Sequence, residues 1–172
     1  MNMEDLYVHA ALTHLRSIRI LNLHPAMDST LSIQCELDEV SLDHNPQYAA
    51  ISYTWGDQEL LCPIECNERK LLVTPNCLAA LRHLRNTSEI QTFWIDSICI
   101  DQTSLEERSQ QVALMGEIYR SANRVLVWLG EHDERTRKAM NCIAEIADSK
   151  GFDPGVFQTE LHRRVDILKR GK

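Results

Sequence analysis

The sequence lacks the features that take a chain into or across a membrane. No apolar run approaches the roughly 20 residues that span a bilayer, and the start MNMEDLYVHA has no basic stretch followed by an apolar core. The sequence also has no G-x-G-x-x-G loop after a strand and no P-loop pattern, which mark dinucleotide and nucleoside triphosphate sites. We therefore expect a soluble, cytoplasmic protein without a membrane span that is not a metabolic dehydrogenase.

Basic residues are outnumbered by acidic ones. The chain has 18 Lys and Arg against 25 Asp and Glu, which gives a formal net charge of −7. Nucleic acids and anionic membranes both favour a basic protein surface, so this balance argues against either as a general partner. We predict no nucleic acid among the partners of this protein.

Cysteine is present, but its pattern predicts neither disulfides nor a metal site. Most of the cysteines lie inside apolar runs of a chain without a secretory start, so we expect reduced, buried thiols. Cys62 and Cys66 are close in sequence, yet no His or second Cys pair lies nearby at zinc-site spacing. We predict no metal and no bound cofactor. The six cysteines are Cys35, Cys62, Cys66, Cys77, Cys99 and Cys142.

What the sequence does contain is an alternation of apolar strands and amphipathic helices, in a chain of 172 residues that fits one domain. Such an alternation predicts an α/β fold with a mainly parallel sheet and right-handed crossovers. On the longest predicted helix, Val112, Met115, Tyr119 and Ala122 recur at spacings of three and four, which is typical of a buried face. The expected core strands are 48–55, 93–100 and 124–129, and the expected helices run from Thr74 to about Arg85 and from Ser104 to Ala122.

Further elements flank this core. Residues 17–23 and 31–37 alternate apolar and polar side chains, so they predict two strands that pair antiparallel as an N-terminal extension. A short helix over residues 6–15 precedes them. Residues 63–66 and 70–74 predict a hairpin inserted after the first core strand.

The C-terminal part of the chain has a helical pattern over residues 134–150 and a break at residues 151–155, GFDPG, before a last helical segment. We assign residues 1–132 to the domain core with its N-terminal extension. We assign residues 133–172 to a C-terminal helical segment that belongs to the domain or leads out of it in a longer protein.

Unusual residues gather where a binding site of such a sheet is expected. Ligands of open parallel sheets usually lie beyond the carboxyl ends of the strands. The first core strand ends in Trp55-Gly56-Asp57, and the end of the second carries residues 96–102, DSICIDQ. We therefore place the candidate site at these strand ends and at the start of the helix that begins at Ser104.

Several long stretches resemble the heterokaryon incompatibility (HET) domains of filamentous fungi. Residues 48–57, YAAISYTWGD, resemble the family's Y-x-A-L-S-Y-x-W-G-D, and residues 94–102, WIDSICIDQ, resemble W-I-D-x-x-C-I-N-Q with Asp101 where Asn is usual. Residues 107–122 match E-R-x-x-Q-V-x-x-M-x-x-I-Y-x-x-A, and residues 125–130 match V-x-V-W-L-G. The resemblance covers about residues 16–132, and it is specific because the motifs occur in the right order.

This resemblance implies both a biological role and a fold. HET domains trigger programmed cell death when genetically different hyphae fuse. We therefore expect a cell-death effector that self-associates and responds to an unidentified incompatibility partner or upstream activator. HET domains are distantly similar to Toll/interleukin receptor (TIR) domains, which implies a TIR-like, flavodoxin-like fold of three layers. Some TIR domains cleave NAD, and others only assemble signalling scaffolds.

The likeness to TIR domains implies a site that cleaves the nicotinamide–ribose bond of NAD as its substrate. Such a reaction passes through an oxocarbenium-like transition state, which a nearby carboxylate stabilises. Glu107 and Asp96 are the predicted catalytic carboxylates. An aromatic ring would stack on the nicotinamide, and the helix N-terminus would receive the pyrophosphate. The predicted substrate-binding residues are Tyr53, Trp55, Gly56, Asp57, Asp101, Gln102 and Arg108.

The helix-start candidates also have a structural interpretation, and the sequence leaves both open. Ser104-x-x-Glu107 fits a capping box, in which the carboxylate of Glu107 returns to the backbone of its own N-cap. Arg108 would then pair with Asp96 or Asp101 as a structural contact.

The other candidates are open in the same way. Tyr53 shares a face with Ile51 and would pack in the core, while Gln102 would either fix its own loop or contact a ligand. The TIR enzymes carry their catalytic glutamate in a helix after a later strand, and no equivalent is visible here. A second hypothesis is therefore a non-enzymatic module that triggers death by homotypic assembly.

Overall fold

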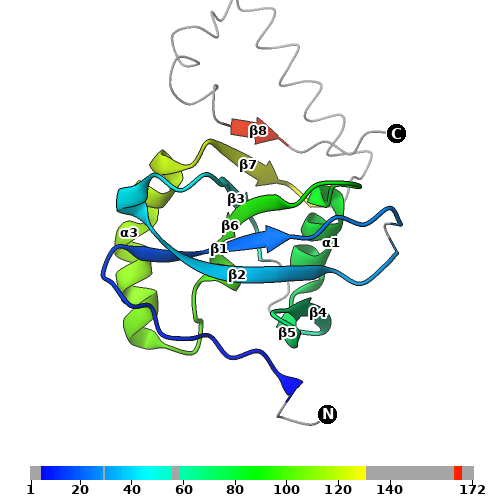
Figure 1. Cartoon of the computed structure of the whole chain (residues 1–172), viewed down its shortest axis with the longest axis horizontal. Helices are drawn as coiled ribbons and strands as arrows, with labels where there is room; N and C mark the ends of the chain where they lie inside the picture. Colours follow the sequence, from blue (N-terminus) through cyan, green and yellow to red (C-terminus); the bar gives the residue numbers. More distant parts are fainter. Residues whose placement is uncertain (1–4, 29, 56–58, 131–164, 168–172) are drawn as a thin grey trace, which may run out of the picture.

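The protein folds around one twisted β-sheet (Figure 1). The structure is a computed structural model and describes residues 5–28, 30–55, 59–130 and 165–167. Within these residues the sheet has eight strands in the order β5-β4-β2-β1-β6-β3-β7-β8. The elements in chain order are β1 (Ser17–Leu23), β2 (Gln34–Ser41), the 3-10 turn η2 (Leu42–His44), β3 (Ala49–Tyr53), β4 (Cys62–Cys66), β5 (Arg69–Val73), α1 (Pro75–Leu84), β6 (Gln91–Ile95), α2 (Asp96–Cys99), α3 (Leu105–Ser121), β7 (Arg124–Trp128) and β8 (Val165–Ile167).

Only part of this sheet is parallel. β3 pairs parallel with β6 on one side and with β7 on the other, and β8 extends β7 in the same direction. β1, however, is antiparallel to both β2 and β6, and β4 is antiparallel to β5 although parallel to β2. The sheet is therefore mixed, and the prediction of a mainly parallel sheet is wrong.

The N-terminal hairpin of β1 and β2 causes this difference. The sequence predicts the two strands as antiparallel partners, which is confirmed, but it does not say which edge of the core sheet they extend. β1 continues the sheet from β6, with Leu21 opposite Phe93. All residues of β1 except Asn22 are buried, so the strand is covered on both faces. A position inside the sheet removes more of its apolar surface from water than a position at the edge, which explains why β1 lies between β2 and β6.

The hairpin of β4 and β5 that follows β3 is as the sequence predicts. It does not stay apart from the sheet, because β4 pairs with the outer side of β2.

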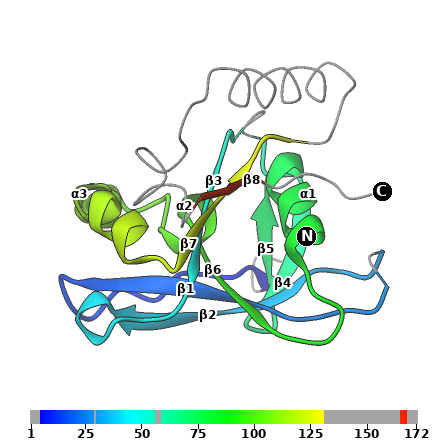
Figure 2. The ribbon, with the colours of Figure 1, turned by 90° about the horizontal axis from the view of Figure 1, so that it is seen from above.

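α1 and α3 lie on opposite sides of the strands β6, β3 and β7, as Figure 2 shows. On one face the ring of Trp94 in β6 meets that of Tyr119 in α3 edge-on, with centroids 5.5 Å apart. On the other face Trp128 in β7 contacts His83 in α1 at 5.2 Å between centroids. The core strands therefore carry a helix on each face.

Both long helices begin where the sequence predicts. Thr74 Oγ1 accepts a hydrogen bond from the amide of Cys77 at 3.2 Å, and Pro75 is the first residue of α1. Ser104 Oγ accepts one from the amide of Glu107, also at 3.2 Å, at the start of α3. These caps fix the helix starts because the amides of a first turn have no partner within the helix.

Two predicted elements are wrong. The segment 6–15 is not a helix: Leu6 forms an isolated bridge with Lys70, and the residues that follow are irregular. The second core strand does not run to residue 100, because it stops at Ile95 and the chain turns at once into α2. Asp96 is therefore the first residue of a short helix and not an interruption within a strand.

The spacing of Val112 predicts that it lies on the buried face of α3, but this prediction is wrong. Its side chain is 60% exposed, and the helix buries Gln111 and Ile118 instead. The amide of Gln111 donates a hydrogen bond to the carbonyl of Ser17 at 2.9 Å. Met115, Tyr119 and Ala122 do pack against the core, so three of the four predicted positions are confirmed and Gln111 is buried in place of Val112.

Of the predicted C-terminal segment 133–172, the structure describes only residues 165–167, which form β8 in place of a helix. The expected helix over 134–150 lies outside the described residues. No helix among the described residues is long and apolar enough to cross a membrane.

The described cysteines are free thiols, as the sequence predicts. Cys62 is partly exposed and the other four are buried, namely Cys35, Cys66, Cys77 and Cys99. Cys142 lies outside the described residues.

Candidate functional site

The carboxylate of Asp96, just beyond the carboxyl end of β6, meets the indole of Trp55 from the end of β3. Trp55 Nε1 lies 3.2 Å from each carboxylate oxygen, and the amide of Ser97 donates to Oδ1 at 2.7 Å. Burial raises the pKa of Asp96, although these donors oppose the rise. A carboxylate with a raised pKa accepts a proton more readily than an ordinary aspartate, which suits acid–base chemistry.

Ser97 joins two further side chains to this strand end. Its Oγ lies 2.6 Å from the hydroxyl of Tyr53 and 3.9 Å from the sulfur of Cys77. Burial raises the pKa of both Tyr53 and Cys77, and that of Cys77 reaches about 11. Both groups therefore stay protonated at neutral pH, and the thiol of Cys77 is a poor nucleophile.

Asn76, in the first turn of α1, ties together the ends of two strands. Its Nδ2 donates to the carbonyl of Thr54 after β3 at 2.6 Å, and its Oδ1 accepts from Nε1 of Trp128 in β7 at 2.9 Å. Because one side chain bonds both strands, the carboxyl ends of β3 and β7 are held at a fixed spacing. We refer to Tyr53, Trp55, Asn76, Asp96 and Ser97 as the strand-end site.

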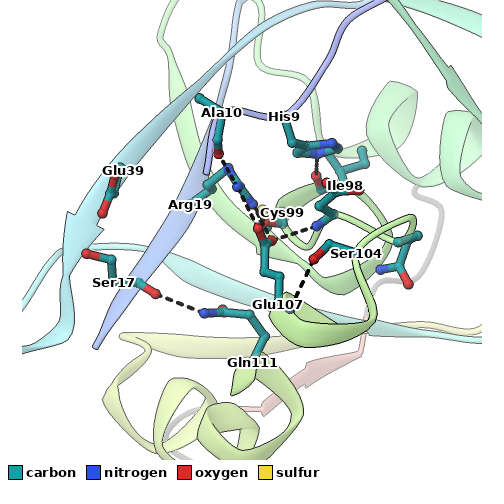
Figure 3. Close-up of polar contacts among 12 residues, drawn as sticks. His9, Ala10, Ser17, Arg19, Glu39, Ile98, Cys99, Ser104, Glu107 and Gln111 are labelled. Carbon is teal, nitrogen blue, oxygen red and sulfur yellow. Dashed lines mark hydrogen bonds and ion pairs between the residues drawn. The ribbon is translucent and has the colours of Figure 1, made fainter. Parts of the chain in front are cut away.

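Glu107 belongs to a different cluster, centred on Arg19 of β1 (Figure 3). The two side chains form a two-point ion pair, Nη1 to Oε1 at 2.6 Å and Nη2 to Oε2 at 2.9 Å. Arg19 is 4% exposed and Glu107 is 11% exposed. Arg19 also donates to the carbonyls of Cys99 and Ala10, so the guanidinium joins β1, α2, α3 and the N-terminal segment.

The carboxylate of Glu107 also holds the loop before its own helix. Oε1 accepts a hydrogen bond from the amide of Asp101 at 2.7 Å. Burial alone would raise the pKa of Glu107, but the hydrogen bonds from Arg19 and the Asp101 amide lower it below its ordinary value. The expected capping box is only half formed, since the carboxylate bonds Asp101 and not the amide of Ser104.

The remaining predicted residues divide between loop contacts and solvent. Asp101 Oδ1 accepts two hydrogen bonds from Thr103, a turn contact within the loop. Gln102 Nε2 donates to the backbone carbonyl of Asp96 at 2.9 Å, so it fixes the loop to α2. Arg108 is exposed and takes part in none of the described ion pairs, so the expected pair with Asp96 or Asp101 is wrong.

The structure thus separates what the sequence put in one site. Tyr53, Trp55 and Asp96 come together at the strand ends, and Gln102 reaches them through the backbone of Asp96. Glu107 lies with Arg19 in the second cluster. Gly56 and Asp57, the other predicted binding residues, lie outside the described residues.

Arg19 is the main residue that sequence reasoning missed. A signal for it exists, because strand alternation puts Arg19 on the same face as Leu21 and Leu23, both buried. A charged residue on a buried face needs a partner of opposite charge. Asn76 and Ser97 gave no comparable signal, because their contacts depend on how α1 and α2 pack on the sheet.

No group of His, Cys, Asp or Glu among the described residues is arranged to hold a metal ion. An open hollow does lie at the other end of the core strands, lined by residues that include Gln47, Thr92 and Asn123 from the amino ends of β3, β6 and β7. It is shallow and polar, and it contains none of the residues predicted for the site.

Comparison with known proteins gives a consistent result. The family model for the heterokaryon incompatibility protein (HET) matches residues 48–166. The chain is 37% identical over 142 residues to the heterokaryon incompatibility protein 6, OR allele, of Neurospora crassa. The match covers 75% of this chain and 21% of that relative, so the chain spans about a fifth of its length. No solved structure matches the chain. The family match extends beyond residue 132, where the motifs found in the sequence end.

Proposed function

The chain belongs to the heterokaryon incompatibility (HET) family, and from that premise we propose that it is the cell-death effector domain of a fungal incompatibility protein. The name of the Neurospora crassa relative supports this role. That relative is much longer than the matched region, so other parts of such a protein would recognise the incompatibility partner. The domain would act in the cytoplasm, where fused hyphae mix their contents.

The chemistry proposed for the effector is cleavage of NAD between nicotinamide and ribose. The bond from ribose C1′ to the ring nitrogen breaks, and its electron pair goes to the departing nicotinamide. Water adds to C1′ and loses a proton, so the products are nicotinamide, ADP-ribose and a proton. The C1′ centre carries positive charge in the transition state, which a carboxylate within a few ångströms stabilises.

Asp96 is the better of the two predicted catalytic carboxylates, and its environment is the observation that carries this proposal. It has a raised pKa and lies at a strand end beside Trp55, whose partly exposed side chain would stack on a nicotinamide. Its oxygens face a neutral indole N–H and an amide, and no cation of the described residues forms an ion pair with it. Both oxygens of Glu107, in contrast, are bonded to the Arg19 guanidinium, which leaves that carboxylate a supporting role.

The arrangement of the core strands supports a TIR-like, flavodoxin-like relationship. The parallel strands run in the order β6-β3-β7-β8, so the chain moves first to one side of β3 and then to the other. Flavodoxin-like sheets have this order and bind ligands where it reverses. The strand-end site lies at that reversal, between the carboxyl ends of β6, β3 and β7.

Nicotinamide release from NAD by the purified chain tests the proposal. Wild type is expected to release nicotinamide at high protein concentration or when clustered on a scaffold. Asp96→Asn, which keeps the shape of the side chain, should release none, while Asp38→Asn at an exposed position of β2 should match wild type. Activity that survives in Asp96→Asn would move the chemistry elsewhere.

The second candidate is a non-enzymatic module that kills by homotypic assembly. The observation that favours it is the structural engagement of Glu107, together with exposed Leu105 and Val112 on α3. It predicts that Asp96→Asn still kills fungal cells and leaves their NAD level unchanged. Viability and NAD measured in the same cells therefore separate the two candidates.

A further inference from the structure

The outer face of α3 carries a row of apolar and small side chains that no described part of the chain covers. Leu105, Ser109, Val112 and Gly116 follow one another at spacings of four, three and four, so they form one stripe along the helix. We call it the α3 stripe. Leu105 is 73% exposed and Val112 is 60% exposed, while Ser109 and Gly116 are also exposed. Figure 2 shows α3 at one side of the molecule, away from α1.

No contact within the described part of the chain requires a glycine at position 116. Among the described residues, a methyl group added to it would meet no atom within 4 Å, so no described part of the chain packs against the helix there. Its backbone is ordinary helix, and glycine in a helix interior lowers stability relative to alanine. A glycine in such a position allows the backbone of another helix to approach closely.

The α3 stripe is complementary to itself in the antiparallel direction. If two copies of α3 cross with a two-fold axis between Gln110 and Gln111, Leu105 of one copy lies opposite Gly116 of the other. Ser109 then lies opposite Val112. Each large side chain meets a small one, and each such contact occurs twice, as a two-fold interface requires. A partner of unrelated sequence would have no reason to match this order.

The charges near the ends of the stripe agree with the same arrangement. In this register the last turn of one helix, which carries Arg120, lies at the same end as the loop before the α3 of the second copy, which carries Asp101. Hydrogen bonds from Thr103 keep the pKa of Asp101 low against the effect of burial, so the carboxylate is ionised at neutral pH. Opposite charges at the rim favour this register over parallel packing.

From these relationships we infer that the α3 stripe is a self-association surface on which a second copy of this chain packs its own α3, antiparallel. The inference names a surface for the clustering and homotypic assembly considered under the proposed function, and in that sense it rests on that function. A helix of 17 residues offers an interface smaller than the roughly 800 Å² per partner of a stable complex, which is typical of weak, reversible contacts. Association therefore depends on concentration, which suits a domain that must stay inactive until it is clustered.

Sedimentation velocity of the full chain over a wide range of concentration tests the surface. Wild type is expected to shift reversibly from monomer to dimer. Gly116→Leu should weaken association by roughly tenfold or more, because the new side chain meets Leu105 of the second copy. The same substitution should not harm the fold, since leucine is a better helix former than glycine. Gln110→Leu, exposed on another side of α3, is the matched control and should associate like wild type.

An exchange of the large and small positions makes the test specific. In Leu105→Ala/Gly116→Leu the small residue lies opposite the new large one, so dimerisation should return toward the wild-type level. A wild-type chain that stays monomeric throughout, or a Gly116→Leu chain that associates normally, would show that a second copy does not pack on the α3 stripe. The rest of a longer protein would then be the better candidate.

The same samples separate this inference from the proposed function. If Gly116→Leu disrupts a dimer but the protein neither cleaves NAD nor kills cells, the self-association surface is confirmed and the proposed function is wrong. Activity with unchanged association in Gly116→Leu leaves the function standing and the surface wrong.

Discussion

Arg19 of β1 and Glu107 of α3 lie 88 residues apart in the chain and form a two-point ion pair in the interior of the protein. The pair joins the N-terminal hairpin to the helix that crosses from β6 to β7. Breaking it would leave a buried charge without its partner, which costs more than the pair itself contributes. Its first role is therefore to fix the fold, whatever else Glu107 does.

Glu107→Gln is expected to lower the free energy of unfolding by about 3 kcal/mol, the usual cost of removing one partner of a buried pair. Urea unfolding followed by tryptophan fluorescence measures it. Glu117→Gln is the control, because Glu117 pairs with Arg16 at the surface and both side chains are about a third or more exposed. Its loss should be much smaller. Equal losses in the two variants would show that the Arg19–Glu107 pair has no special weight.

The low pKa of Glu107 predicts a specific dependence of stability on pH. A carboxyl whose pKa is lower in the folded state stabilises the protein above its unfolded pKa, here 4.5. That contribution disappears as the pH falls through the folded value. The difference in unfolding free energy between wild type and Glu107→Gln should therefore be constant near neutral pH and shrink below 4.5. A difference that stays constant into strong acid would contradict the assignment.

Asp96→Asn is expected to change stability in the opposite direction. Burial raises the pKa of Asp96, so the charged form is disfavoured in the folded protein at neutral pH. Asparagine keeps the acceptor for Trp55 and Ser97 without the charge, and should stabilise the fold by about 1 kcal/mol or less. Thermal unfolding at neutral pH measures the effect. A clear loss of stability would mean that the carboxylate is needed for structure.

The cap of α3 gives a fourth prediction. Ser104→Ala removes the hydrogen bond to the amide of Glu107 and should cost about 1 kcal/mol. Ser109→Ala on the same helix should be neutral or slightly stabilising, because Ser109 only bonds back to the carbonyl of Leu105. Both variants are best compared by urea unfolding at low protein concentration, where the chain is monomeric. Losses of similar size would argue against a capping role.

Local pattern was enough to predict most of the strands and both long helices. β1 agrees with its predicted bounds of 17–23, and the caps at Thr74 and Ser104 mark the helix starts. These features depend on a few neighbouring residues, through strand alternation or the needs of a first helical turn.

The predictions that failed depend on contacts between distant segments. The position of β1 beside β6 follows from which sheet edge remains uncovered, and no local pattern carries that information. Which of Gln111 and Val112 is buried likewise depends on a distant partner, because the amide of Gln111 donates to the carbonyl of Ser17 while Val112 is exposed.

The candidate site shows the same division. The motifs place Trp55 and Asp96 at strand ends. The structure brings them together because β3 and β6 are parallel neighbours, whose carboxyl ends lie side by side. The partner of Glu107 could not be found from motifs alone, because Arg19 lies outside them.

The position of β1 in the sheet also affects how the chain is made. β1 can pair with β2 as soon as both leave the ribosome, but its other edge must wait for β6, with Phe93 joining Leu21. At a synthesis rate of about 5–20 residues per second, roughly 3 to 10 seconds pass between the completion of β2 and the synthesis of that partner. During this interval the nascent hairpin presents an open, apolar strand edge, the kind of surface that chaperones bind and that neighbouring nascent chains can join.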